Sequence, residues 1–424
     1  MDKNGIFLVS IGDELLDGRT PNTNAVFFGE QLRMNGISVA EIRCVSDRIE
    51  DIAEALRYGK NFPIVVCTGG LGPTNDDRTI EAAAKAFRRK IVTTKASLEH
   101  VRSRYAARGL ELNEHRLRLA RVPEKAKILQ NLNGTAPGVL CREGKTNFFF
   151  LAGVPSECRP LFEREILPIA LKQRQKKLVR REFWRSFGLP ESAVYQLVEP
   201  LVSELEKKYP DSFRFGVHIS FPCIDLTLEI WQAKGKKIPS QKEIDAAVAE
   251  ISEKTKKICF TRERDTLVES VMKLLLAKKK TLATAESCTG GLLGKMLTDI
   301  PGSSAAYLGG VVSYANSAKE KLLSVPKSLL VEHGAVSEPV VKKMAESIRE
   351  HLGADFALSL SGVSGPGGGS EKKPVGTIHV ALANKESTKT LHQVIMNGRG
   401  SREQNRIVAA HLALDALRLT LLES

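Results

Sequence analysis

The chain has 424 residues, with 63 lysines and arginines against 49 aspartates and glutamates and a formal net charge of +14. That length exceeds what one ordinary hydrophobic core supports, so it predicts two or three domains. There is no signal peptide and no apolar run near twenty residues, and the seven cysteines include no CxxC pair. We therefore expect a soluble, cytoplasmic protein and no membrane partner.

Strands and helices alternate through the first 70 residues. NGIFLVSIG is a buried-strand pattern that ends at Gly12, the segment 22–35 is helical, and ISVAEIRCV and FPIVVCTGG are two further strands. This alternation predicts an α/β domain with a parallel sheet, whose ligand site lies at the carboxyl ends of the strands. Gly12, Asp13, Glu14 and the loop GGLGPTNDDRT fall at those ends.

The loop GGLGPTNDDRT combines glycines with two adjacent acids. The amides of Gly69, Gly70 and Gly72 can cradle phosphate oxygens, while Asp76 and Asp77 can hold a hard divalent cation against a pyrophosphate. Adjacent acids also cap helices, and one of these two is expected to cap the helix that begins near residue 78.

A charge run, ALKQRQKKLVRREFW, begins the middle of the chain. FGLPESAVYQLVEPLVSELEKKY is helical and HISFPCIDLTLEIW alternates like an exposed strand pair, which predicts a small α+β module. The runs KQRQKKLVRR, KGKK and KTKK invite a nucleic-acid interpretation. The segment lacks the GxxG loop that would grip a nucleic-acid backbone, so we favour a basic surface that attracts anionic nucleotides.

A serine stands between a strand and a helix in KTLATAESCTGGLLGKMLT. The strand ends at Ser287, and Gly290 and Gly291 open an apolar-periodic helix. A hydroxyl there is exposed at the sheet edge beside free helix amides that can stabilise negative charge, which favours a nucleophile. The competing interpretations are that Ser287 is a helix N-cap and that Cys288 is the nucleophile, although a free cysteine is commonly buried.

Three later segments could complete this site. VVSYANSAKEKLL runs from a strand through Tyr314 into a helix that carries Lys319, which is either a desolvated base or a solvated surface lysine. DFALSLSGVSGPGGGSEKKP breaks from a strand into a glycine-rich loop, either a phosphate nest or a flexible connector. The last helix carries Arg402 and Arg406 one turn apart, where they could clamp a phosphate.

The C-terminal strings resemble the nicotinamide mononucleotide deamidase family, the C-terminal domain of the CinA proteins. AESCTGG, IPGSSAAYLGGVVSYANSAK, HGAVSEPVV and SGVSGPGGGSEKKPVGT carry the resemblance, which covers residues 263–424. It implies an α/β domain that hydrolyses nicotinamide mononucleotide to nicotinate mononucleotide and ammonia without a cofactor, with Ser287 and Lys319 as the catalytic pair. The further implied site residues are Tyr314 for catalysis and Thr289, Gly290, Gly362, Gly365, Arg402 and Arg406 for substrate binding.

Two positions depart from that family pattern. The family loop usually reads GIAGPDGG, whereas Gly367 stands here in place of the aspartate. The family string GDR before the last helix appears here as Gly400, Ser401 and Arg402, so only the arginine transfers.

The N-terminal strings IGDELLDGRTPNTNAVFFGEQL, LNGTAPGVL and LAGVPSECRPLFEREILP resemble the other end of the same family. They imply a three-layer, molybdopterin-binding-like domain over residues 1–170 with metal-dependent ADP-ribose pyrophosphatase activity, and residues 171–262 resemble its KH-like connecting domain. The implied residues are Gly12, Asn24, Gly69, Gly70, Gly72, Thr74 and Thr135 for substrate, and Asp13, Glu14, Asp76 and Asp77 for a divalent metal such as Mg²⁺.

These expectations together describe an enzyme of NAD recycling that acts on small nucleotides, and the resemblance implies a homodimer. Two other classes stay open at this point. The fold alone would suit a molybdenum-cofactor-related binding protein, and the basic charge would suit a nucleic-acid-associated competence or damage factor.

Overall fold

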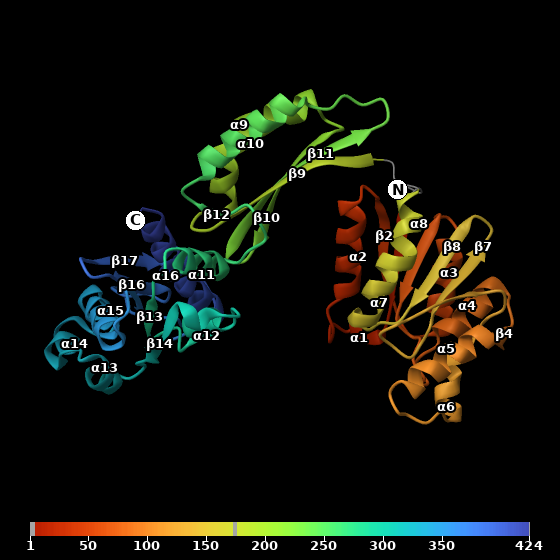
Figure 1. Ribbon diagram of the computed structural model, residues 1–424, viewed down its shortest axis with the longest axis horizontal. Coiled ribbons are helices and arrows are strands. Elements are labelled where there is room, and N and C mark those ends of the chain that lie inside the picture. Colours follow the sequence, from red (N-terminus) through yellow and green to blue (C-terminus); the bar gives the residue numbers. More distant parts are fainter. Residues whose placement is uncertain (1–4, 173–175, 424) are drawn as a thin grey trace. The chain divides into compact units, whose positions relative to one another are not determined.

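Two units make up the chain in the computed structural model, which describes residues 5–172 and 176–423 (Figure 1). Unit 1 comprises residues 1–179 and 231–238, and unit 2 comprises residues 180–230 and 239–424. The division into three domains at residues 170 and 262 stays a prediction.

A six-stranded mixed sheet forms the centre of unit 1. Its order is β2-β1-β3-β8-β7-β6, in which the first four strands are parallel and the last two antiparallel. The three strands that the sequence predicted to form a parallel sheet, β1, β2 and β3, are indeed parallel, and the antiparallel strands β7 and β6 extend that sheet. β7 and β8 are joined by only Gly144 and Lys145, and a two-residue connection forces an antiparallel hairpin. The strands are β1 (Ile6–Ile11), β2 (Val39–Val45), β3 (Ile64–Thr68), β6 (Lys127–Leu129), β7 (Gly138–Glu143) and β8 (Thr146–Leu151).

Both faces of this sheet are covered, which gives three layers (Figure 1). Phe7 and Val9 of β1 join one core with α3, α4 and α5, while Ile6 and Leu8 join the other core with α2, α7 and α8. The period of two in a strand explains why a continuously apolar sequence fills two cores. The helices are α1 (Asp13–Leu16), α2 (Thr23–Met34), α3 (Ile49–Gly59), α4 (Thr79–Phe87), α5 (Lys95–Ala106), α6 (Glu114–Leu117), α7 (Pro155–Leu161) and α8 (Leu167–Leu171), beside a small sheet of β4 (Ile91–Thr93) and β5 (Arg121–Pro123).

The middle of the chain forms a four-stranded sheet in the order β10-β11-β9-β12 with two helices, in agreement with the predicted α+β module. The expectation of an exposed strand pair was wrong for β11, which is buried along most of its length. Asp225 and Glu229 mimic an exposed face in sequence, but they pair with Arg185 and Arg181 of β9. The elements are β9 (Lys176–Ser186), α9 (Glu191–Lys208), β10 (Phe213–Ser220), β11 (Cys223–Ala233), α10 (Gln241–Thr255) and β12 (Cys259–Thr261).

The C-terminal sheet has the order β14-β13-β15-β16-β17, with β14, β13 and β15 parallel and the last two strands antiparallel. Ala283 and Ala285 of β13 pack against α15, whereas Leu282 faces the core shared by α11, α12 and α16. The elements are α11 (Leu267–Ala277), β13 (Leu282–Glu286), α12 (Leu292–Thr298), β14 (Tyr307–Val312), α13 (Asn316–Leu323), α14 (Lys327–His333), α15 (Glu338–Leu352), β15 (Phe356–Gly362), β16 (Thr377–Ala383), β17 (Thr388–Val394) and α16 (Arg402–Glu423).

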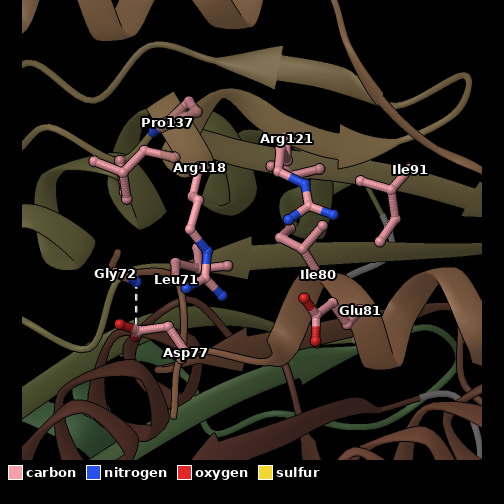
Figure 2. Close-up of a pocket in the computed structure, with 13 residues that line it drawn as sticks. Leu71, Gly72, Asp77, Ile80, Glu81, Ile91, Arg118, Arg121 and Pro137 are labelled. Carbon is pink, nitrogen blue, oxygen red and sulfur yellow. Dashed lines mark hydrogen bonds between the residues drawn. The ribbon is translucent and has the colours of Figure 1, made fainter. Parts of the chain in front are cut away.

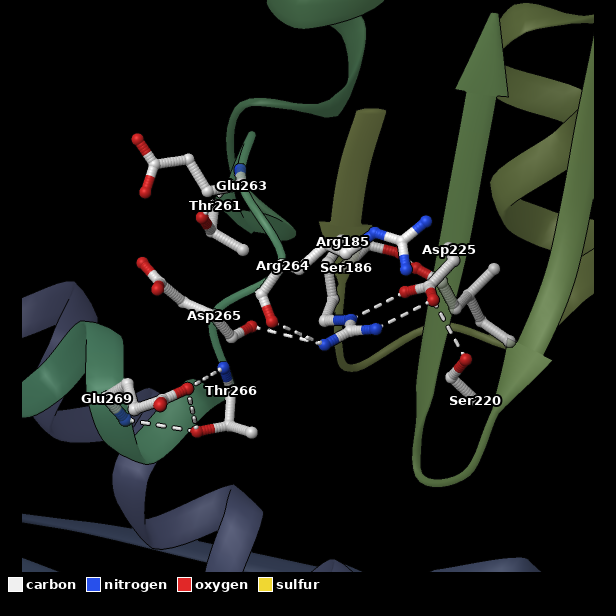
Figure 3. A network of polar contacts seen from close by, with 11 residues as sticks. Arg185, Ser186, Ser220, Asp225, Thr261, Glu263, Arg264, Asp265, Thr266 and Glu269 are labelled. Carbon is white, nitrogen blue, oxygen red and sulfur yellow. Dashed lines mark hydrogen bonds and ion pairs between the residues drawn. The ribbon is translucent and has the colours of Figure 1, made fainter. Parts of the chain in front are cut away.

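A polar network ties the middle sheet to the segment that leads into α11 (Figure 3). The Arg185 guanidinium binds both oxygens of Asp225 at 2.6 and 2.8 Å and donates to the carbonyls of Arg264 and Asp265. Phe187 also joins the C-terminal core, with its ring 5.6 Å from that of His411. These contacts place the middle sheet and the C-terminal sheet in one unit. Within the described residues, no helix is long and apolar enough to cross a membrane.

Two candidate active sites

Ser287 lies in a tight turn between β13 and α12. Gly290 and Gly291 have φ values of 59° and 93°, a left-handed conformation that glycine adopts without strain. The first residue before α12 is Gly291, and the Ser287 hydroxyl caps no helix amide. The N-cap interpretation of Ser287 is therefore excluded.

The amides at the start of α12 are already used. Glu286 is 2 % exposed, and its carboxylate accepts hydrogen bonds from the amides of Gly291, Leu293 and Gly294 at 3.0, 3.1 and 2.7 Å. The expectation that helix-opening amides serve Ser287 was wrong for this turn, because the preceding carboxylate occupies them. In the described part of the chain, no acceptor on another residue pairs with the amides of Cys288 and Thr289, which remain available.

Lys319 reaches Ser287 from the start of α13. Its side chain is 1 % exposed, and Nζ lies 3.0 Å from Ser287 Oγ, 2.7 Å from the Ser313 carbonyl and 3.3 Å from the Tyr314 carbonyl. Burial lowers the pKa of Lys319, and within the described residues no carboxylate pairs with it. Lys319 is thus a desolvated lysine, not a solvated one.

The same contacts can serve a neutral amine. Its two N–H groups can donate to the carbonyls of Ser313 and Tyr314, and its lone pair can then accept the proton of the Ser287 hydroxyl. The hydroxyl proton then has an acceptor within 3.0 Å.

A cavity of about 190 Å³ opens beside this pair. Arg402 lines it and donates to Tyr314 Oη at 2.8 Å and to the Gly365 carbonyl at 2.7 Å. The two arginines do not form the expected common clamp, because Arg406 lies beneath the turn and donates to the Thr289 carbonyl. The lining residues are Ser287, Cys288, Tyr314, Lys319, Ala335, Val336, Ser361, Gly362, Ser364 and Arg402.

Four of the predicted substrate-binding residues do not line this cavity. They are Thr289, which is fully buried, and Gly290, Gly365 and Arg406. Sequence reasoning missed the lining residues Ser361 and Ser364. Their position where β15 breaks into the glycine-rich loop was the available signal.

Cys288 lines the same cavity but does not fit the role of nucleophile. Burial raises the pKa of its thiol to about 11, so the thiol is protonated at neutral pH. The side chain belongs to the core beneath the turn, as expected of a small buried residue.

A larger cavity of about 500 Å³ lies in unit 1 at the carboxyl ends of β1, β3 and β8. It brings together most of the predicted residues from this end of the chain, whereas Asp13 and Thr74 do not line it. The predicted residues that line it are Gly12, Glu14, Asn24, Gly69, Gly70, Gly72, Asp76, Asp77 and Thr135.

Asp77 organises the loop at this cavity. Its carboxylate accepts from the amide of Gly72 at 2.7 Å and from the amide and hydroxyl of Thr74. Neither acid caps α4, which begins after Arg78 without a side-chain cap, so that expectation was wrong. Of the three amides predicted to bind phosphate, two already have partners: the Gly69 amide donates to the Leu151 carbonyl and the Gly72 amide donates to Asp77. Only the Gly70 amide is left for a ligand among the three.

Asp47 is a cavity residue that sequence reasoning missed. Burial raises its pKa, and the nearby carboxylates of Asp13, Glu14 and Asp76 add to the shift. Asp47 lies two residues after the end of strand β2. The expectation that ligand-binding residues follow the carboxyl ends of parallel strands, which pointed to Asp13 after β1, would also have pointed to Asp47.

The carboxylates of this cavity are of the ligand type that a divalent cation such as Mg²⁺ prefers. Within the described residues, no group of three histidines, cysteines or acids could hold a metal ion at once. Mg²⁺ is commonly bound through one or two carboxylates together with substrate phosphates, so this donor set suits an ion that arrives with its substrate.

A small slot adjoins the large cavity and shares Gly70, Gly72 and Asp77 with it (Figure 2). Arg118 and Arg121 point into the slot from one side, and Asp77 and Glu81 lie opposite. The slot has a volume of only about 30 Å³, which is too small for a nucleotide. Its two arginines therefore serve mainly to place positive charge beside the larger cavity.

Two family models match the two ends of the chain. Residues 7–172 match the family model of a probable molybdopterin binding domain, and residues 264–421 match that of the CinA C-terminal domain. A putative competence-damage inducible protein from Caldanaerobacter subterraneus subsp. tengcongensis is 37% identical over 405 residues, which cover 94% of each chain. A CinA-like protein from Geobacter sulfurreducens is 37% identical over 424 residues, 98% of this chain and 99% of that one.

The chain therefore belongs to the CinA family. Among solved structures, the competence damage-inducible protein A (ComA) from Klebsiella pneumoniae shares 36% identity and covers 37% of this chain and 95% of its own, with a TM-score of 0.35.

Proposed function

We propose that the C-terminal site hydrolyses the carboxamide of nicotinamide mononucleotide to nicotinate mononucleotide and ammonia. The observation that carries the proposal is the 3.0 Å contact between Ser287 Oγ and the Nζ of the buried Lys319. A serine becomes a nucleophile when a neighbouring base takes its proton, and burial lowers the pKa of a lysine so that its neutral, proton-accepting form is populated at moderate pH.

The steps balance with these groups alone. Neutral Lys319 accepts the Ser287 proton as Oγ bonds to the carboxamide carbon, and the oxyanion forms next to the amide of Cys288, a residue that lines the cavity. The lysine ammonium then gives its proton to the leaving nitrogen, and ammonia departs as the C–N bond breaks. Water attacks the acyl-serine, Lys319 takes its proton, and the serine is regenerated as the acid leaves.

Arg402 is the group best suited to the anionic end of the substrate. Its guanidinium lines the cavity, its two hydrogen-bond partners are Tyr314 Oη and the Gly365 carbonyl, and no carboxylate pairs with it among the residues that the structure describes. A cavity of about 190 Å³ suits the pyridine carboxamide, while the phosphate would lie at the rim beside Arg402 and Tyr314, which is 60% exposed.

The test is to incubate the whole protein with nicotinamide mononucleotide, with and without a chelator, and to measure ammonia and nicotinate mononucleotide. Stoichiometric release of both, unaffected by the chelator and absent from Ser287→Ala, supports the proposal. An inactive wild-type protein or a fully active Ser287→Ala protein contradicts it.

For the cavity in unit 1 we propose metal-dependent cleavage of ADP-ribose to AMP and ribose 5-phosphate. Glu14, Asp47 and Asp76 line it, and one or two of these carboxylates, together with the phosphates of the substrate, would hold the divalent cation, which when bound would neutralise the pyrophosphate charge. The free amide of Gly70 would bind a phosphate oxygen. The matching test measures AMP release from ADP-ribose with a chelator and after Mg²⁺ is added back. Molybdopterin binding without any cleavage would instead favour a molybdenum-cofactor role.

A further inference from the structure

Nearly every polar side chain around the Ser287 cavity already has a partner. Lys319 is bound to Ser287 Oγ and to two carbonyls, and Arg402 is bound to Tyr314 Oη and to the Gly365 carbonyl. The Ser361 hydroxyl donates to the Ala335 carbonyl at 2.8 Å. The hydrogen-bonding groups of these three side chains are therefore already paired within the protein.

Ser364 is the exception. Of the cavity-lining side-chain oxygen and nitrogen atoms in the described chain, only its hydroxyl is buried without an oxygen or nitrogen partner. The residue is 4 % exposed, so bulk water does not compensate for the missing partner. The Cys288 thiol lies beside it, and its interaction with the hydroxyl lowers the pKa of that thiol against the effect of burial, but sulfur is a weak acceptor that does not satisfy the hydroxyl.

The main chain holds Ser364 firmly in this position. Asn405, which is fully buried, donates from Nδ2 to the carbonyls of Ser364 and Gly400 at 3.0 and 3.1 Å. The next carbonyl, that of Gly365, is bound by Arg402. A hydroxyl that is fixed, buried and unpartnered in a binding cavity is unfavourable unless a ligand satisfies it.

We infer that the Ser364 hydroxyl accepts a hydrogen bond from the carboxamide NH₂ group of the substrate and so favours amides over esters. The inference rests on the proposed deamidation. The Cys288 amide, on a residue that lines the cavity, suits the carboxamide oxygen, which leaves the nitrogen in need of an acceptor. The lone pair of neutral Lys319 serves Ser287, and the Ser361 hydroxyl already has the Ala335 carbonyl as a partner, so the Ser364 hydroxyl, which is buried without an oxygen or nitrogen partner, gains most by accepting this bond.

The Ser364 hydroxyl can be removed without breaking a hydrogen bond to another oxygen or nitrogen atom. It would add binding and selectivity to the chemistry proposed for Ser287 and Lys319. Replacement by alanine should therefore leave a folded enzyme.

The experiment compares wild type, Ser364→Ala and Ser364→Thr with nicotinamide mononucleotide and with the methyl ester of nicotinate mononucleotide, which has no N–H group. Ser364→Ala should raise KM for the amide about three- to tenfold, the effect of one neutral hydrogen bond, with a smaller change in kcat. The KM for the ester should stay constant. Ser364→Thr keeps a hydroxyl and should recover most of the affinity for the amide.

Ser347→Ala is the matched control, because that hydroxyl is also buried and unpartnered but lies on α15 outside the cavity. It should change neither KM. An active wild-type enzyme whose KM for the amide is unaffected by Ser364→Ala, or whose amide and ester KM rise equally, overturns the inference. A wild-type protein that deamidates nothing overturns the proposed function first, so the two failures are distinguishable.

Discussion

Burial gives Lys319 its chemical character. Lysine side chains in a basic protein are normally solvated and charged, yet this one is sealed between α13 and the turn after β13 with two carbonyls and one hydroxyl as partners. An ammonium there would have no counter-ion within the described residues, so the neutral form gains stability relative to water. Burial therefore destabilises the charged ammonium form of Lys319 and favours the neutral form, which is the form that the proposed mechanism needs as its base.

A pH profile tests this character. The pKa of Lys319 is lowered by burial, and the base must be deprotonated to accept the serine proton, so kcat/KM for nicotinamide mononucleotide should rise with pH through that lowered pKa. Lys319→Arg should not restore activity at any pH, since a guanidinium stays protonated. A rate that falls as the pH rises towards the ordinary lysine pKa of 10.5 would contradict the role of base.

A double-mutant cycle tests whether Ser287 and Lys319 act as one unit. Each single alanine variant should lose about three or more orders of magnitude in kcat, and the double variant should be scarcely worse, because a nucleophile without its base and a base without its nucleophile are equally idle. The measurement is kcat for ammonia release by all four proteins. Losses that multiply would instead show two independent roles.

The sequence pointed to the two residues of the proposed catalytic pair, but it did not reveal their electrostatic surroundings. The strand-to-helix position marked Ser287, and the next strand and helix marked Lys319. The burial of Lys319, the use of the α12 amides by Glu286 and the lone hydroxyl of Ser364 all depend on contacts between elements far apart in the chain. Such contacts leave no local pattern.

At the scale of elements, Glu286 links strand β13 to helix α12. A carboxylate from the strand replaces the usual N-cap side chain and satisfies three amides in the first turn. The turn 287–291 is thereby held between two fixed ends, which fixes the position from which Ser287 Oγ meets Lys319. We regard Glu286 as a positioning residue.

Replacing this carboxylate should damage both stability and rate. Glu286→Gln introduces an NH₂ group among three amide donors and should cost about 1–3 kcal/mol in the free energy of unfolding, with a lower kcat and little change in KM. Denaturant unfolding and steady-state kinetics measure the two effects. Glu269→Gln is the control, because it weakens the exposed capping box of α11 away from Ser287 and should lower stability without lowering kcat. Equal effects of the two variants on kcat would contradict a positioning role.

Periodicity and turn signals located most strands and helices, and they failed where charge or loop chemistry competed. Alternating charges made β11 resemble an exposed strand, although Asp225 and Glu229 are paired and buried. The acidic loop predicted a helix cap, whereas Asp77 turns back to Gly72 and Thr74. In each case the sequence showed the polar residue but not its distant or backbone partner.

At the scale of the whole molecule, the two cavities fall in different units, one lined by acids and the other by a lysine and an arginine. Their chemistry should therefore separate under a chelator. ADP-ribose cleavage should stop and resume when Mg²⁺ is added back, while ammonia release continues throughout, because the steps at Ser287 use only side chains and amides.

The two adjacent acids of unit 1 allow a sharper separation. Asp76 lines the cavity, and the Thr74 hydroxyl lowers its pKa, so it is charged at neutral pH. Asp76→Asn should reduce ADP-ribose cleavage about 100-fold or more, the scale of losing one group that stabilises transition-state charge, and should leave deamidation intact. Asp77→Asn should also reduce cleavage, but by disturbing the loop conformation, because Asp77 holds Gly72 and Thr74.

The response to Mg²⁺ distinguishes the two variants. Raising the Mg²⁺ concentration should rescue part of the activity of Asp76→Asn and none of that of Asp77→Asn. Equal loss of deamidation in either variant would show that the units do not act independently, and full cleavage by Asp76→Asn would remove that carboxylate from the proposed metal site.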